Sequence, residues 1–317
     1  MTYERGVYPL KRHVLKINEN PTLRELHNTA FSFSVLETRS LSKSWILENF
    51  FVLKYNQTLS YDVKFFLKWH CFNRKFVFYY NGMAIVKKII SHIDRNCYIY
   101  MELNEFFIPN RPAYTAFDFY HDILIYGYDE NDQIFFTIAY NKDGLYKTQK
   151  IHYLNIINAY ENYKHKYKLK IMPFRISEKY DFNKFHKSSI KKSLKKMLYS
   201  SKKHIGYNAY NDLLKHIDMV TYESGKLDLR AFRTILEHSK TLTYINDYFS
   251  ITNHSYNLLI ELNKKANFIF LLSMKYNLTQ SENLILKIKK HILEYMKMQK
   301  QTLIKIHSEI FNQNNCK

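Results

Sequence analysis

The run from His121 to Tyr140 restricts the fold more than any other part of the sequence. His121 to Tyr128 is an apolar and aromatic segment, residues 129–133 are polar, and residues 134–140 form a second apolar segment. Two such segments joined by a short polar loop predict an antiparallel β-hairpin. A second turn is predicted at residues 141–144. The first part of the chain should therefore contain an antiparallel sheet.

The rest of the chain divides into a mixed part and a helical part. Apolar spacing predicts helices near residues 23–36, 44–53, 83–93 and 153–163, and strands near residues 97–108 and 167–175. From about residue 182 onward the apolar residues recur only at helical spacing. The sequence predicts an α+β domain over residues 1–180 and a basic helical domain over residues 181–317.

The charge is large and uneven. The chain of 317 residues carries a net charge of +20. Residues 1–150 hold 19 Lys and Arg against 15 Asp and Glu, whereas residues 151–317 hold 29 against 13. Such a charge favours an acidic partner, which in general can be nucleic acid, an anionic membrane or an acidic protein. The alternative explanation is a genome of low GC content, in which codons for Lys, Asn, Ile and Tyr are frequent.

Glycine, cysteine and histidine usage exclude several kinds of site. The six glycines lie at least 17 residues apart, so no glycine-rich nucleotide-binding motif is possible. The three cysteines show no C-x-x-C spacing, and the 14 histidines form no H-E-x-x-H motif and no zinc-finger spacing, so we expect no metal site. With no apolar signal segment and no membrane-length apolar run, we expect a cytoplasmic protein with no transmembrane segment.

One histidine is placed where it can do chemistry. His121 begins the first strand of the hairpin, and Asn141 directly follows the second strand. In an antiparallel pair a histidine at a strand start can lie beside an asparagine at a strand end, which can then orient the imidazole. A surface histidine at the start of a strand is the simpler interpretation.

This region resembles a known family. The run His121–Asp129, the strand of residues 134–140 and the turn of residues 141–144 look like the histidine hairpin of papain-like cysteine peptidase folds. The nearest group is the butirosin-biosynthesis type of acyltransferase, with relatives beside nonribosomal peptide and other thiotemplated assembly lines. The segment His204–Leu214 is similar to the segment that opens the helical C-terminal part of that family.

The resemblance implies an acyl-transfer chemistry. Members of the family use a cysteine nucleophile, a histidine base and an Asp or Asn that orients the base. They take an acyl group from the phosphopantetheine thioester of a carrier protein and pass it to an amine in antibiotic and other specialised-metabolite biosynthesis. His121 then corresponds to the base, Asn141 to the orienting residue, and Asp143 is the second candidate for that role. No bound cofactor is implied beyond the phosphopantetheine on the partner.

The nucleophile expected from the resemblance is absent. Its position falls within residues 25–30, which contain no cysteine, while Cys71 lies outside the expected helix. Hydroxyl groups are offered there by Thr29, Ser32 and Ser34. Three explanations stay open at this point. The chain is an inactive relative that kept the fold for binding, an engineered variant in which Ala30 replaces a cysteine, or an active enzyme with rearranged residues.

The basic second half predicts where a partner binds. Four lysines lie beside or opposite an apolar stripe formed by Ile190, Leu194 and Leu198; they are Lys191, Lys192, Lys195 and Lys196. We expect this face to bind an acidic acyl or peptidyl carrier protein, because opposite charges accelerate association. The alternative function is a basic nucleic-acid-binding protein, in which lysines contact phosphates and aromatic rings stack on bases.

Overall fold

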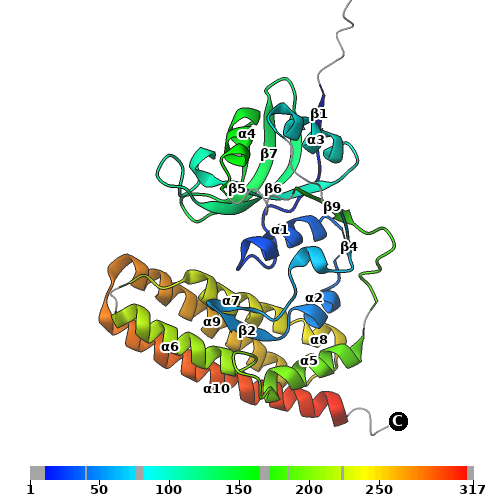
Figure 1. Cartoon of the computed structure of the whole chain (residues 1–317). Helices are drawn as coiled ribbons and strands as arrows, with labels where there is room; N and C mark the ends of the chain where they lie inside the picture. The colour runs from blue at the N-terminus through cyan, green and yellow to red at the C-terminus, as the bar shows by residue number, and fades with distance from the viewer. Residues whose placement is uncertain are drawn as a thin grey trace, which may run out of the picture. The chain divides into compact units, whose positions relative to one another are not determined.

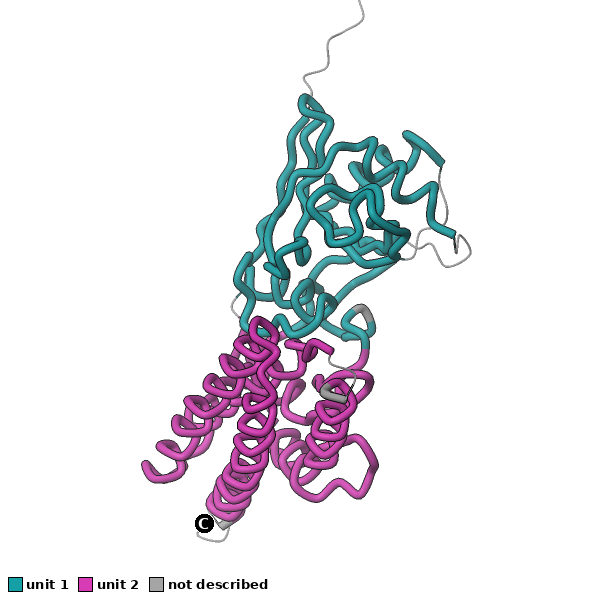
Figure 2. Tube along the Cα trace, turned by 90° about the vertical axis from the view of Figure 1, so that its left-hand side faces the viewer, with its two compact units in different colours: residues 1–39, 65–180 teal, residues 40–64, 181–317 magenta. Residues whose placement is uncertain are grey.

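The computed structural model describes residues 11–39, 41–75, 81–164, 171–184, 186–222 and 225–312. The protein is an α+β protein with an antiparallel sheet and a helical C-terminal part, as the sequence predicts. It has two compact units, coloured separately in Figure 2. Unit 1 comprises residues 1–39 and 65–180, and unit 2 comprises residues 40–64 and 181–317.

Unit 1 is built around one antiparallel sheet. In its described part the strands run in the order β4-β9-β5-β6-β7-β8, and β1 pairs with β6. The strands are β1 (Arg12–Val14), β4 (Phe72–Arg74), β5 (Tyr98–Asn104), β6 (Tyr120–Asp129), β7 (Ile134–Tyr140), β8 (Tyr146–His152) and β9 (Met172–Ile176). The hairpin β6–β7 is the one that the sequence predicts. β8 extends it by a further antiparallel strand, which the sequence analysis did not find.

Helices bury the apolar surfaces of this sheet. α3 (Met83–Ile93) contacts β5 and β6, and α4 (Tyr153–Glu161) contacts β5 and β8 (Figure 1). α1 (His27–Leu36) contacts β7. Every residue of α1 from Thr29 to Leu36 is buried, so this helix has no solvent-facing stripe and forms part of the core. Two short 3-10 helices, η1 (Phe66–Lys68) and η2 (Glu105–Phe107), complete unit 1.

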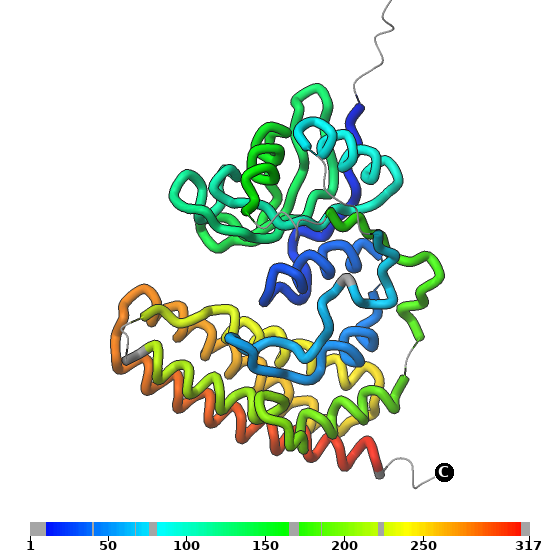
Figure 3. The backbone as a smooth tube through the Cα atoms, viewed as in Figure 1, coloured from blue at the N-terminus to red at the C-terminus, as the bar shows by residue number. Residues whose placement is uncertain are grey.

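Unit 2 is mainly helical. Its helices are α2 (Lys43–Asn49), α5 (Lys187–Tyr199), α6 (Asn208–Tyr222), α7 (Leu229–Leu242), α8 (Ile245–Tyr248), α9 (Asn253–Thr279) and α10 (Glu282–Asn312). The hairpin β2 (Leu53–Asn56) and β3 (Thr58–Tyr61) packs against α6 and α7, as the blue tube in Figure 3 shows. None of the helices in the described part of the chain is long and apolar enough to cross a membrane.

The domain division differs from the prediction in one segment. One boundary between the units lies between residues 180 and 181, as the sequence predicts. Residues 40–64 nevertheless belong to unit 2. Part of that segment, residues 44–53, was predicted as one helix. In the structure α2 ends at Asn49 and β2 begins at Leu53. The apolar run of residues 50–53 is buried. A short apolar run of this kind is compatible with a buried helix or a buried strand, so its hydrophobicity alone does not distinguish them.

A buried histidine lies in the core of unit 2. His238 of α7 is fully buried, and its Nε2 atom donates a hydrogen bond of 2.9 Å to the backbone oxygen of Phe51. Its Nδ1 atom lies 3.3 Å from Nε2 of Gln299 on α10. Burial lowers the pKa of His238 to about 4, and the bond to Phe51 only partly offsets this effect. The imidazole is therefore neutral in the folded protein at neutral pH.

We predict that His238 makes unit 2 less stable as the pH falls below about 6.5, the ordinary pKa of histidine. Below that value His238 becomes protonated in the unfolded chain, whereas in the folded chain it stays neutral until the pH approaches 4. The free energy of unfolding should therefore drop by about 2 kcal/mol from this group between pH 7 and pH 5. His238→Gln, which keeps a donor for Phe51, should remove this part of the pH dependence.

Urea denaturation of a Trp69→Phe background would measure this effect, because Trp45 of unit 2 is then the sole tryptophan. The matched control is His254→Gln, since His254 is exposed. An identical loss of stability on acidification in the His238→Gln variant and its parent would contradict the prediction.

Candidate functional site

Three polar side chains from distant parts of unit 1 meet at the N-terminal end of α1. His27 is the first residue of α1, and His121 and Asp122 lie near the start of β6. α1 packs on β7, which pairs with β6, so the helix end and the strand start come together (Figure 1). We call these three residues the His-His-Asp cluster.

The three side chains are in mutual contact. The Nδ1 atom of His27 lies 2.8 Å from Nδ1 of His121 and 2.8 Å from Oδ1 of Asp122. The Nδ1 atom of His121 lies 2.6 Å from the same carboxylate oxygen. The backbone N–H of Asp122 also points to Nδ1 of His121, at 2.9 Å. The side chains of His27, His121 and Asp122 are 17%, 31% and 13% exposed, so the cluster is partly open to solvent.

Aromatic residues enclose the cluster. The ring of Tyr140 stacks on the His27 ring, with centroids 4.8 Å apart and planes 11° from parallel. Phe119 packs against His121, with ring centroids 5.4 Å apart. The hydroxyl of Tyr100 donates a 3.2 Å hydrogen bond to Oδ2 of Asp122. These contacts restrict all three rotamers and leave Oδ1 of Asp122 for the two imidazoles.

A buried ion pair holds the strands beneath the cluster. Arg111 and Glu105 are each 3% exposed, and Nε of Arg111 donates a 2.7 Å hydrogen bond to Oε1 of Glu105. The same guanidinium donates to the backbone oxygen of Tyr140 at 2.6 Å and to that of Asp122 at 3.3 Å. Arg111 therefore links the start of β6 to the end of β7.

Burial and mutual contact set the protonation of the cluster. Burial lowers the pKa of His27 to about 4, because the hydrogen bond and charge of Asp122 only partly replace its hydration. Burial also disfavours the charged form of His121, but Asp122 outweighs burial and raises the pKa of that imidazole. Burial favours the neutral form of Asp122, yet its contacts with both histidines hold the pKa of this carboxyl well below its usual range. At neutral pH, His27 is neutral and Asp122 is ionised.

The structure keeps His121 at the centre of the site but gives it a different partner. The register of Leu124 with Ile138, continued along the strands, places His121 opposite Asn141. The Asn141 side chain nevertheless binds its own turn. Its Oδ1 accepts from the backbone N–H of Asp143 and Leu145, and its Nδ2 lies 3.3 Å from Oδ2 of Asp143.

Among the described residues, no hydrogen bond joins His121 to Asn141 or Asp143, although both were predicted as its orienting residue. Asp122 takes that position instead. The physical reason is that Asn141 lies one residue beyond the strand, where the unpaired N–H groups of the turn compete for its amide oxygen.

Within the segment of residues 25–30, the structure brings His27 to His121. The hydroxyl groups that were considered as nucleophiles form hydrogen bonds with other residues. Thr29 donates its hydroxyl to Glu25 at 3.0 Å, Ser32 donates to the Thr29 backbone oxygen, and Ser34 shares a hydrogen bond with Tyr146. Ala30 is fully buried inside α1. The arrangement thus offers an imidazole at the helix end, which the sequence analysis did not consider.

The described cysteines are not placed for nucleophilic chemistry. Cys71 is 1% exposed, and burial raises the pKa of its thiol to about 12, so it stays protonated. Burial also raises the pKa of Cys97. Cys316 lies outside the described residues.

The four predicted binding lysines lie on α5 in unit 2. The apolar stripe beside them, formed by Ile190, Leu194, Met197 and Leu198, is buried as expected. Lys191 and Lys195 place their ammonium groups 4.6 and 4.8 Å from the ring centroid of Phe311 on α10. Lys196 forms a 2.6 Å ion pair with Asp62, and Lys192 is exposed. Three of the four lysines thus already interact with other residues of unit 2.

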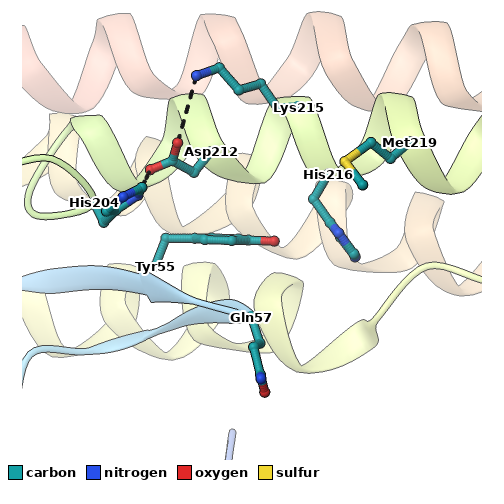
Figure 4. A pocket seen from close by; sticks show the side chains of 7 residues that line it. All are labelled: Tyr55, Gln57, His204, Asp212, Lys215, His216 and Met219. Carbon is teal, nitrogen blue, oxygen red and sulfur yellow. Dashed lines mark hydrogen bonds and ion pairs between the residues drawn. The ribbon is translucent and has the colours of Figure 1, made fainter.

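Titratable side chains also line a shallow pocket in unit 2 (Figure 4). It has a volume of about 420 Å³ and lies beside the Tyr55 ring. His204 contacts Asp212 through Nδ1 and Oδ2 at 2.6 Å, and Lys215 is 3.8 Å from the same carboxylate. The other lining residues are Gln57, His216 and Met219.

No protein-family model matches this chain, and no curated protein matches it. The assignment of function therefore depends on the residues themselves.

We predict that Arg111→Leu lowers the free energy of unfolding of unit 1 by about 3–5 kcal/mol, because it leaves the buried Glu105 carboxylate without its partner. The double variant Arg111→Leu with Glu105→Leu should recover part of that loss. Urea denaturation in a Trp45→Phe background, where Trp69 reports on unit 1, would measure both values.

The matched control is Lys164→Ala, which breaks the exposed ion pair with Asp118 in unit 1 and should cost less than about 1 kcal/mol. A loss from Arg111→Leu no larger than that of the control would show that the buried pair does not hold the strands.

Proposed function

We propose that this protein acts on acyl thioesters of carrier proteins in specialised-metabolite biosynthesis and transfers the acyl group directly to an amine, without a cysteine nucleophile. The His-His-Asp cluster is the observation that carries the proposal. It combines an imidazole oriented by a carboxylate with partial exposure, which is what a proton acceptor for an external substrate needs.

The position of the cluster in the fold supports a papain-like relation. A helix end faces a histidine at the start of an antiparallel strand, which is the arrangement that the family resemblance implies. His27 lies inside the segment where the resemblance places the nucleophile. An imidazole at this position, with no described thiol beside His121, favours direct transfer over a covalent acyl-enzyme.

The chemistry assigns one role to each group. The amine nitrogen attacks the thioester carbonyl carbon, so that a C–N bond forms and the C–S bond breaks. Nε2 of His121 accepts the proton that the amine loses and returns it to the departing phosphopantetheine sulfur. Asp122 holds the Nδ1 side of the same ring and thereby fixes the tautomer, as the aspartate of a Ser-His-Asp triad does. His27 is a positioning residue that restricts rotation of the His121 ring.

We predict that the protein releases thiol from an acyl carrier protein only when an amine acceptor is present, and that His121→Ala lowers kcat/KM by about 10²–10⁴-fold. Intact-protein mass spectrometry of the carrier would follow loss of the acyl group without interference from Cys71 and Cys97. The control variant is His254→Ala, which removes an exposed histidine of unit 2. A parent protein no faster than free imidazole would identify an inactive relative and end the proposal of catalysis.

The basic face of α5 fits an acidic carrier protein as the donor. Lys192 is exposed, and Lys191 and Lys195 keep their charges close to the surface over Phe311. Lys196 belongs to an ion pair with Asp62, so it contributes less to the field that a partner meets. Rim charges act mainly on the association rate and are screened by salt.

We predict that the triple reversal Lys191→Glu, Lys192→Glu and Lys195→Glu slows association with an acidic carrier protein at least about tenfold at low salt. Surface plasmon resonance at two salt concentrations would measure the rates. The control is the triple reversal of Lys240, Lys275 and Lys287, which changes the net charge equally at other exposed positions of unit 2.

Equal effects of the two triple variants would remove α5 as the docking face. Equally tight binding to random single-stranded DNA would favour the nucleic-acid-binding alternative instead.

A further inference from the structure

The His-His-Asp cluster contains a conflict of hydrogen bonds. Each imidazole Nδ1 carries either a proton or a lone pair in the ring plane, never both. With Asp122 ionised, each contact to its oxygen needs a proton on the facing nitrogen, whereas the contact between the two nitrogens needs a proton on only one of them. No placement of protons gives all three contacts, at 2.6–2.8 Å, a hydrogen bond.

A single cation removes this conflict, because it binds three lone pairs at once. We infer that His27, His121 and Asp122 bind one divalent transition-metal ion of the zinc class through Nδ1, Nδ1 and Oδ1. The three donor atoms come from one small group of described residues and already converge. No metal site was predicted from the sequence, because metal-binding motifs are recognised there by short spacings and His27 is 94 residues from His121.

The size of the triangle indicates the coordination. Ligand atoms about 2.1 Å from a metal ion are about 3.0 Å apart at right angles and about 3.4 Å apart in a tetrahedron. The distances of 2.6–2.8 Å are closer to the right-angled spacing, so loading requires the atoms to separate by a few tenths of an ångström. Three ligands on one face leave the opposite positions for water or substrate.

The ligand types select the metal. Two imidazoles and one carboxylate suit zinc, cobalt and ferrous iron rather than calcium or magnesium, which prefer oxygen ligands. The Tyr100 hydroxyl bonds the second oxygen of Asp122, and Tyr140 stacks on His27, so both neighbours support the ligands from outside. When the metal binds, Nδ1 of His121 gives up its contact with the backbone N–H of Asp122 and bonds to the metal instead.

Metal binding itself does not depend on the proposed transfer reaction, but its consequence for that reaction does. An imidazole that binds a metal through Nδ1 carries its proton on Nε2. The loaded His121 ring therefore cannot accept a proton there, and zinc should inhibit the proposed transfer reversibly.

The test is a titration of the full-length, chelator-treated protein with Co²⁺, followed by visible absorption, and with Zn²⁺, followed by calorimetry. One equivalent should bind. His27→Phe, which keeps an aromatic ring against Tyr140, and Asp122→Asn should each weaken binding by more than about 100-fold. Tyr100→Phe should weaken it about tenfold, as loss of an outer contact does.

The control is His204→Ala, which breaks the His204–Asp212 contact in unit 2 and should leave the titration unchanged. Circular dichroism would verify that each variant folds. Absence of Co²⁺ binding at 1 mM, or binding unaffected by both ligand substitutions, would overturn the inference. Because the titration needs no substrate, an absent acyl-transfer activity with intact metal binding would reject the proposed function alone.

Discussion

The buried pair of Arg111 and Glu105 is the interaction on which the candidate site depends most directly. One guanidinium bonds the backbone oxygens of Tyr140 and Asp122, so it ties the end of β7 to the start of β6. Tyr140 in turn stacks on His27. A polar pair is costly to bury, and its several charge-assisted hydrogen bonds offset that cost only in this geometry. The pair therefore fixes where the cluster can form.

The parts of the fold that follow from local pattern could be predicted. The helix of residues 83–93 and the strand of residues 134–140 agree with α3 and β7 residue for residue. The helix has apolar residues at a clear helical period, and the strand is a nearly continuous apolar run between two polar turns. His121 was also found, because the start of a strand can be identified from its neighbours. The hairpin β2–β3 was missed because its strands are only four residues long and β2 begins within the apolar run that follows α2.

The chemistry of the site was less accessible, because each missing partner is a long-range or unusual contact. Alternation along a strand places neighbouring side chains on opposite faces, which argues against a pair between His121 and Asp122. At the start of β6 the imidazole nevertheless reaches the adjacent carboxylate. In the sequence, His27 is a single histidine in a predicted helix and Arg111 is a single charged residue between predicted elements. Only the packing of α1 on β7 and the pairing of β6 with β7 bring them together.

The structure has an imidazole where the family resemblance leads us to expect a thiol, and this difference changes the chemistry that the arrangement can perform. A thiolate beside a histidine is stabilised by the charge of the imidazolium, so proton transfer between them creates the nucleophile. Two imidazoles and one carboxylate instead form three electron-pair donors in contact, and burial keeps His27 neutral rather than charged. Such a group can bind one cation at a time, either a proton or the divalent metal ion proposed above. Under the two proposals, the cation that the cluster holds determines whether His121 acts as a base or as a metal ligand.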